Sequence, residues 1–132
     1  DALWEVKKHS PIKIEADQSC RSFADAQMLI KNRMVDSINT GIPKVGSLGE
    51  VRRIAELCEA NGIRCALSNT AGSMVGDAAA VHLAASVPGI APLCELGEFE
   101  VITGDPFFGL SIDKGSISVP EGEGLGVSLR GF

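Results

Sequence analysis

The stretch DSINTGIPKVGSLGEVRRIAELCEANGI, residues 36–63, contains the clearest structural unit of the chain. Its first part, residues 37–40, is predicted to be a short strand from residue propensity alone. Gly62 predicts the end of the following helix, since glycine readily adopts the left-handed conformation of a helix cap. The apolar residues of that helix recur at the i, i+3, i+4 and i+7 positions of one face, and they are Val51, Ile54, Ala55 and Cys58.

The same strand–helix rhythm extends on both sides of this unit. Each of the first three apolar segments is followed by a helical pattern, and repeats of this length are typical of a (β/α) barrel, whose chemistry lies at the carboxyl ends of its strands. We therefore predict an α/β fold, with the barrel-like strand–helix pattern over residues 1–103 and a glycine-rich tail over residues 104–132. The four apolar segments start at intervals of 25, 27 and 27 residues, at Ile12, Ser37, Arg64 and Ala91.

Four strands cannot close a barrel, because closure of this kind needs about eight βα units. The pattern leaves two alternatives. Either the chain is half of a barrel that another piece of polypeptide completes, or it is a small open α/β sheet. The half-barrel predicts a large exposed apolar surface and two open strand edges.

Composition argues against several classes of function. The chain has 132 residues and a net charge of −5, so it lacks the basic face that nucleic-acid binding requires. Its apolar runs are shorter than the roughly 20 residues that span a bilayer. The four cysteines, Cys20, Cys58, Cys65 and Cys94, have no metal-type spacing, and Cys58 and Cys94 fall within apolar patterns as small core residues. Together with the absence of a recognisable signal peptide, reduced thiols predict a cytoplasmic protein.

Polar residues mark the ends of three of the four predicted strands. Asp17 follows the first strand, Asn69 follows the third and Glu95 lies in the fourth. The second strand ends on Gly41, which carries no side chain. If the strands are parallel, these positions meet at one edge of the sheet.

Two other motifs are assigned to structure rather than to chemistry. His82 falls on a predicted helix, and barrel helices face away from the active site. The run Gly122-x-Gly124-x-Gly126 could form a phosphate cradle, but it does not precede a helix, as such a loop would.

Five motifs in order give the chain a resemblance to a known family. They resemble the C-terminal part of the enolase superfamily, in its muconate-cycloisomerase and mandelate-racemase-like branch. The resemblance implies strands five to eight of a (β/α)7β barrel of the TIM type, followed by a tail that returns to a capping domain. The motifs are PIKIEADQS (11–19), the stretch 36–63 quoted above, GDAAAVHLAASVPG (76–89), CEL (94–96) and ISVPEGEGLGV (117–127).

The resemblance also implies a chemistry. Members of this superfamily remove the proton alpha to a carboxylate and stabilise the resulting enediolate on Mg²⁺, which three carboxylates at successive strand ends hold. Two of those carboxylates, and a Lys-x-Lys base motif, belong to the first half of the barrel. The expected partners are therefore a small carboxylate substrate and the N-terminal half with its capping domain, in a complete enzyme that forms a homo-oligomer.

The matching positions supply the site residues that we expect. Asp17 matches the third metal ligand, although an aspartate there could also cap the turn before Ser19. Glu95 matches a glutamate near the substrate, with a surface ion pair as the alternative. Three residues at the end of the third strand are expected to face the substrate, unless they serve only in the turn, and they are Ser68, Asn69 and Thr70.

Three departures from the family pattern affect the expected chemistry. Gly41 stands where relatives carry an acid/base lysine, and glycine cannot transfer a proton. Lys44, three residues later, is a weak substitute on the family pattern. Gln18 replaces a glutamate beside Asp17, which removes a negative charge next to the metal ligand.

These departures favour a Mg²⁺-dependent cycloisomerase or dehydratase on a small carboxylate, because a racemase needs a base on each face of the reacting carbon. Restoring lysine at Gly41 is expected to add exchange from the second face if the scaffold is intact. A racemase or epimerase of the same superfamily, and a non-catalytic degenerate or truncated barrel that acts as a structural partner, are the alternatives. A small flavodoxin-like binding module is a third, which the missing phosphate loop counts against.

Overall fold

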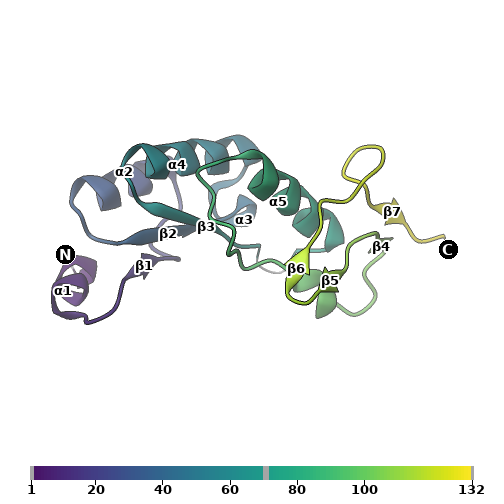
Figure 1. Ribbon diagram of the computed structural model, residues 1–132, viewed down its shortest axis with the longest axis horizontal. Helices are drawn as coiled ribbons and strands as arrows, with labels where there is room; N and C mark the ends of the chain where they lie inside the picture. The colour runs from purple at the N-terminus through teal and green to yellow at the C-terminus, as the bar shows by residue number, and fades with distance from the viewer. Residues whose placement is uncertain (1, 70–71, 132) are drawn as a thin grey trace.

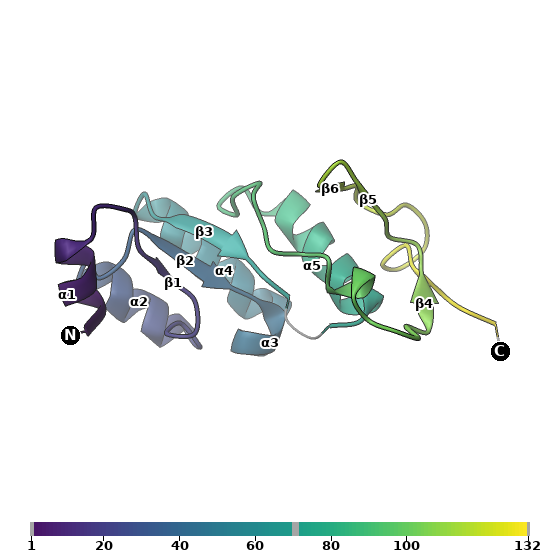
Figure 2. The same cartoon turned by 90° about the horizontal axis from the view of Figure 1, so that it is seen from below.

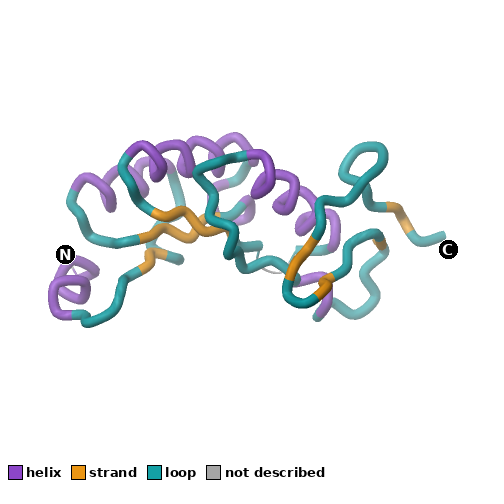
Figure 3. Tube along the Cα trace, in the orientation of Figure 1, coloured by secondary structure: helices purple, strands orange, loops and turns teal. Residues whose placement is uncertain are grey.

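The computed structural model describes residues 2–69 and 72–131 as an α/β chain followed by an irregular tail (Figures 1 and 3). Helices alternate along the chain with the strands of a parallel sheet up to α5, and short strand pairs follow. Thr70, one of the expected substrate-facing residues, lies outside the described residues. The elements are α1 (Ala2–His9), β1 (Glu15–Ala16), α2 (Phe23–Lys31), β2 (Ser37–Thr40), α3 (Ile42–Val45), α4 (Leu48–Ala60), β3 (Arg64–Leu67), α5 (Met74–Ser86), the 3-10 helix η1 (Glu98–Glu100), β4 (Phe107–Phe108), β5 (Ile112–Asp113), β6 (Ser116–Ile117) and β7 (Ser128–Leu129).

The central sheet is parallel, with the strand order β1-β2-β3. Ala16 pairs with Ile38, and Ile38 pairs in turn with Cys65, so the three strands run in one register. Parallel neighbours joined by helices are what the strand–helix rhythm predicts, and this part of the prediction is confirmed. Barrel closure is not seen: within the described residues, no strand pairs with the outer edge of β1.

Local capping signals explain where the two helices over the sheet begin. The Ser22 hydroxyl accepts a hydrogen bond from the Asp25 N–H at 3.1 Å, which caps α2. Ser47 caps α4 in the same way through the Glu50 N–H at 3.2 Å. Such caps satisfy an N–H group that the helix itself leaves unpaired. Gly62 has a φ of 65°, so it follows the end of α4 in the left-handed conformation that the sequence predicts.

The helices α2 and α4 cover one face of the sheet, and the main core lies between them and the strands (Figures 1 and 2). Ile38, Cys65 and Leu67 point into this core and are fully buried. Side chains alternate along a strand, so Ser37 and Asn39 face the other side. That face is polar, since Ser37 donates to Glu15 at 2.7 Å. The large exposed apolar surface that was expected of a half-barrel stays a prediction.

The fourth predicted strand, residues 91–96, is not a continuous strand, and this prediction is corrected. The Ala91 N–H donates to the Cys65 carbonyl at 2.7 Å, and the Glu95 N–H donates to the Leu67 carbonyl at 2.8 Å. Four residue steps along this segment therefore span only two along β3, so a regular ladder cannot form. The segment nevertheless lies alongside β3 in the parallel direction. Two isolated bridges join them, Cys65 with Ile90 and Ser68 with Glu95.

The helix α5 is buried on two sides and connects the sheet layer to the tail. Ala80 and Leu83 pack in the main core, whereas Met74 and Ala78 join a second cluster with Phe99 and tail residues. A turn at Lys114-Gly115 joins β5 to β6, with both residues at positive φ. The division into units over 1–103 and 104–132 stays a prediction.

Candidate functional site

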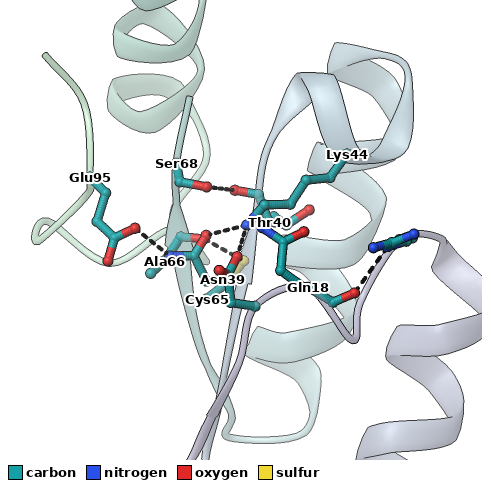
Figure 4. A network of polar contacts seen from close by, with 10 residues as sticks. Gln18, Asn39, Thr40, Lys44, Cys65, Ala66, Ser68 and Glu95 are labelled. Carbon is teal, nitrogen blue, oxygen red and sulfur yellow. Dashed lines mark hydrogen bonds and ion pairs between the residues drawn. The ribbon is translucent and has the colours of Figure 1, made fainter. Parts of the chain in front are cut away.

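Side chains from four separate segments meet at the carboxyl edge of the sheet. Asp17 follows β1, Asn39 lies in β2, Lys44 lies in α3 and Glu95 lies beside the end of β3. Figure 4 shows Lys44, Asn39 and Glu95 as a connected group at this edge. Parallel strands bring these positions together because their carboxyl ends all point the same way.

Hydrogen bonds link the four side chains in one chain across the edge. The Lys44 ammonium donates to the Asp17 carboxylate and, at 3.0 Å, to the Asn39 Oδ1. The Asn39 Nδ2 donates to the Glu95 Oε2 at 3.1 Å. Lys44 has a side chain that is only 10% exposed, whereas that of Asp17 is 49% exposed. We refer to these four residues, Asp17, Lys44, Asn39 and Glu95, as the edge network.

Asn39 is the member of the edge network that sequence reasoning missed. It is 1% exposed, and its amide is oriented at both ends, with the oxygen toward Lys44 and the nitrogen toward Glu95. A signal was available, because side chains two residues apart on a strand share a face. Asn39 therefore shares the face of position 41, at which the family resemblance places an acid/base lysine in relatives.

Gly41 packs against the backbone of Ser68, the residue that follows β3. A Cβ atom at this position would lie 2.1 Å from the Ser68 carbonyl oxygen and 3.1 Å from the Ser68 carbonyl carbon. The Gly41 φ of −174° is extended and suits any residue, so the restriction is purely steric. A lysine here would require a backbone displacement, and restoring it is not the simple substitution that the sequence suggested.

Ser68 and Asn69, expected to face the substrate, are both almost fully buried and bonded to protein groups. Ser68 is 5% exposed, and its hydroxyl donates to the Thr40 carbonyl at 3.5 Å. Asn69 is 4% exposed, and its Nδ2 donates to the Asp77 Oδ1 at 2.9 Å. Their role toward a substrate stays a prediction.

Two buried acids at the start of α5 were also missed by sequence reasoning. Asp77 is fully buried, and Asp105 is 8% exposed. Asp105 accepts a hydrogen bond from the Met74 N–H at 2.6 Å and so caps α5, whereas Ser73 makes no side-chain cap. Asp105 lies 31 residues from Met74 in the sequence, so no local sequence pattern could predict this cap.

Asp17 has the chemistry of one magnesium ligand but does not make a site by itself. Its carboxylate is a hard oxygen donor of the kind that Mg²⁺ prefers. The side chain is half-exposed at the carboxyl edge of the sheet. Within residues 2–69 and 72–131, no group of three or more His, Cys, Asp or Glu side chains is placed to hold a metal ion. The exposed Gln18 beside it adds no charge.

No helix among the described residues is both long enough and apolar enough to cross a membrane.

All four cysteines are free thiols, and Cys20, Cys58 and Cys65 are buried. Half-buried His82 lies within 3.3 Å of the Leu125 carbonyl oxygen through its Nε2, so it contacts the tail and not the carboxyl edge.

Comparison with known proteins gives consistent matches over the whole chain. Residues 1–131 match the family described as "Enolase C-terminal domain-like". A hydrophobic dipeptide epimerase of Enterococcus faecalis is 35% identical over 130 residues, 97% of this chain and 37% of the relative. A chloromuconate cycloisomerase of Pseudomonas putida is 31% identical over 130 residues, 98% of this chain and 35% of the relative.

The fold matches solved structures equally well. A dipeptide epimerase from Cytophaga hutchinsonii, complexed with Mg and the dipeptide D-Ala-L-Val, superposes with a TM-score of 0.90 at 28% identity. The match covers 98% of this chain and 35% of that one. The chain therefore spans about a third of the length of the relatives that it matches. It belongs to the enolase superfamily, in the branch that contains the muconate cycloisomerases and the mandelate-racemase-like enzymes.

Proposed function

We propose that this chain is part of a Mg²⁺-dependent enzyme that removes the proton alpha to a carboxylate of a small substrate. The observation that supports this most strongly is the edge network, which gathers two carboxylates, an ammonium and an amide where the superfamily has its active site. The remaining two-thirds of such a fold, on the same or a separate polypeptide, would supply the other metal ligands and a base. The complete enzyme would form a homo-oligomer.

Each member of the edge network has a role under this proposal. Asp17 would be one ligand of Mg²⁺, and the bound ion would supply Lewis-acid stabilisation of the charge that develops on the substrate carboxylate. Glu95 is exposed, so its carboxylate is accessible on the substrate side. Asn39 orients Glu95 through its amide, and Lys44 balances the negative charge of Asp17.

The reaction type that we propose is a cycloisomerisation or a syn-dehydration. Both can proceed with groups on one face of the reacting carbon, and Gly41 offers no group on the other face. The close approach of Gly41 to Ser68 supports this, because it leaves no space for a side chain at position 41.

Two other functions are alternatives. An epimerase or racemase would need a group on the second face, and Lys44 is the cation at this edge that could supply it. A non-catalytic role would follow if the remaining two-thirds of the superfamily fold did not join this chain. Asp17 would then lack the further ligands that a magnesium site needs.

Solvent exchange of the substrate proton tests the proposal. The complete protein would be incubated with Mg²⁺ and a panel of small carboxylates in D2O, and loss of the alpha proton would be followed by ¹H NMR. We expect exchange or turnover that Glu95→Gln slows by about 10²-fold or more, while the matched change Glu121→Gln in the exposed tail leaves it unaltered. Racemisation of a substrate by the wild-type protein, which has Gly41 in place, would contradict the assignment of chemistry to one face.

A further inference from the structure

Asp77 is a fully buried acid whose two carboxylate oxygens both accept hydrogen bonds. Oδ1 accepts from the Asn69 Nδ2 at 2.9 Å, and Oδ2 accepts from the Phe99 N–H at 2.9 Å. Burying a carboxylate is costly unless such bonds compensate it, and its position in the first turn of α5 is also favourable. The side chain thus joins three segments: Asn69 in the loop after β3, the helix α5 and η1.

These contacts form a closed ring that contains Glu95. The Asn69 N–H donates to the Glu95 carbonyl at 3.2 Å, and the Glu95 N–H donates to the Leu67 carbonyl at 2.8 Å. Phe99 lies four residues after Glu95, so Asp77 holds the segment at its far end while Asn69 holds it at its near end. Gly97, at a φ of 133°, makes the turn between them in a conformation that favours glycine.

The space around the Asn69 amide is shaped for this bond. A Cβ atom at Gly72 would lie 2.2 Å from the Asn69 Nδ2, and one at Gly76 would lie 3.0 Å from it. The two glycines therefore leave room for the amide next to Asp77. Asn69 is 4% exposed, so it is directed toward Asp77 and away from solvent.

We propose that Asp77 is a positioning residue: through Asn69 and Phe99 it fixes the segment 95–99 and keeps the Glu95 carboxylate against the Asn39 amide. The role of Glu95 toward a substrate rests on the proposed function, whereas the positioning itself does not. Among the described residues, the Asp77 side chain makes hydrogen bonds to Asn69 and Phe99 but none to Glu95 or Asn39, so it acts through the ring.

The Asn39 side-chain amide gives a direct readout that needs no substrate. In the complete protein labelled with ¹⁵N-asparagine, the Asn39 Nδ2 protons report its bond to Glu95. We expect Asp77→Ala to shift this resonance and to speed its hydrogen exchange about tenfold, the equivalent of one lost hydrogen bond. An unchanged Asn39 signal in folded Asp77→Ala protein would overturn the proposal.

Asp105 provides the matched control. It is also buried at the start of α5, and it accepts from the Met74 N–H at 2.6 Å and from the Phe107 N–H at 3.0 Å, but it lies outside the ring. Asp105→Ala should lower stability and leave the Asn39 signal as in the wild type. An equal change in both variants would mean that Asp77 acts only through general stability.

A pair of conservative variants covers the case in which Asp77→Ala does not fold. Asn69→Asp places two carboxylates face to face, which opens the ring by repulsion above neutral pH. Adding Asp77→Asn restores both bonds with the roles exchanged, because the amide introduced at position 77 can donate to the carboxylate introduced at position 69 and accept from the Phe99 N–H. We expect the single variant to disturb the Asn39 signal and the double variant to restore it. A double variant as disturbed as the single one would contradict the ring.

Discussion

Replacing Gly41 by alanine tests the steric restriction at the carboxyl edge. The added Cβ would meet the Ser68 carbonyl oxygen at 2.1 Å, so one of the two backbones must move by about 1 Å or more to reach ordinary contact. Overpacking of this kind costs about 1–3 kcal/mol. The adjacent ladder bond, from the Ser68 N–H to the Thr40 carbonyl at 2.8 Å, would be strained as well, at up to about 1 kcal/mol.

An opposing contribution comes from the unfolded chain. Alanine restricts it more than glycine does, which favours folding by about 0.4–1 kcal/mol at positions that tolerate the side chain. The net expectation for Gly41→Ala is therefore a loss of about 1–3 kcal/mol in the free energy of unfolding. Gly41→Lys should lose at least as much, because it shares the same Cβ.

Urea denaturation followed by circular dichroism measures this loss. Gly49→Ala is the matched control, since its Cβ would lie in α4 with its nearest neighbour, the Ser47 hydroxyl, at 3.9 Å. That variant should gain about 0.5–1 kcal/mol. If Gly41→Ala were as stable as the wild type, position 41 could accept a side chain, and the argument for one-face chemistry would lose its structural support.

Three further predictions concern other parts of the chain. Thr40→Val should leave the stability unchanged or raise it by about 1 kcal/mol, because the buried Thr40 hydroxyl has no partner among the described residues; a clear loss in urea denaturation would reveal a hidden bond. The hydrogen bond from the Ile14 N–H, with help from Lys7, lowers the pKa of Asp36. This stabilisation is present above about pH 4 and lost as the pH falls through the lowered pKa, so the stability gap between wild type and Asp36→Asn should narrow on acidification; a gap that widened would contradict it. Burial raises the pKa of Cys20 to about 11, with Asp25 contributing, so native Cys20 should resist iodoacetamide at about pH 8 until the protein is unfolded; peptide mass mapping would detect early labelling.

Local signals explain the parts of the fold that sequence reasoning predicted. The apolar face of α4 and Gly62 both act within one or two helical turns, so they can be recognised from neighbouring residues. The strand β2 followed from propensity and from its place in the repeat. The family motifs then gave the order of the elements.

The failures have a common cause, which is dependence on distant residues. Asn39 and Glu95 are 56 residues apart, and Asp105 caps a helix that begins 31 residues before it. Gly41 has no side chain whose type could predict a contact, and its close approach to the Ser68 backbone is seen only in the folded chain. The fourth strand failed in the same way, because four residue steps from Ala91 to Glu95 span only two steps of β3, a mismatch that only the contact with β3 reveals.

The central claim is that Asp17 contributes to a magnesium site only when the rest of the superfamily fold is present. Isothermal titration calorimetry of Mg²⁺ against the isolated 132-residue chain, and against the complete protein with and without Asp17→Asn, tests it most directly. We predict no measurable binding by the isolated chain, binding by the complete protein, and its loss in the Asp17→Asn variant. Equal binding by the isolated chain, or full binding without the Asp17 carboxylate, would contradict the account.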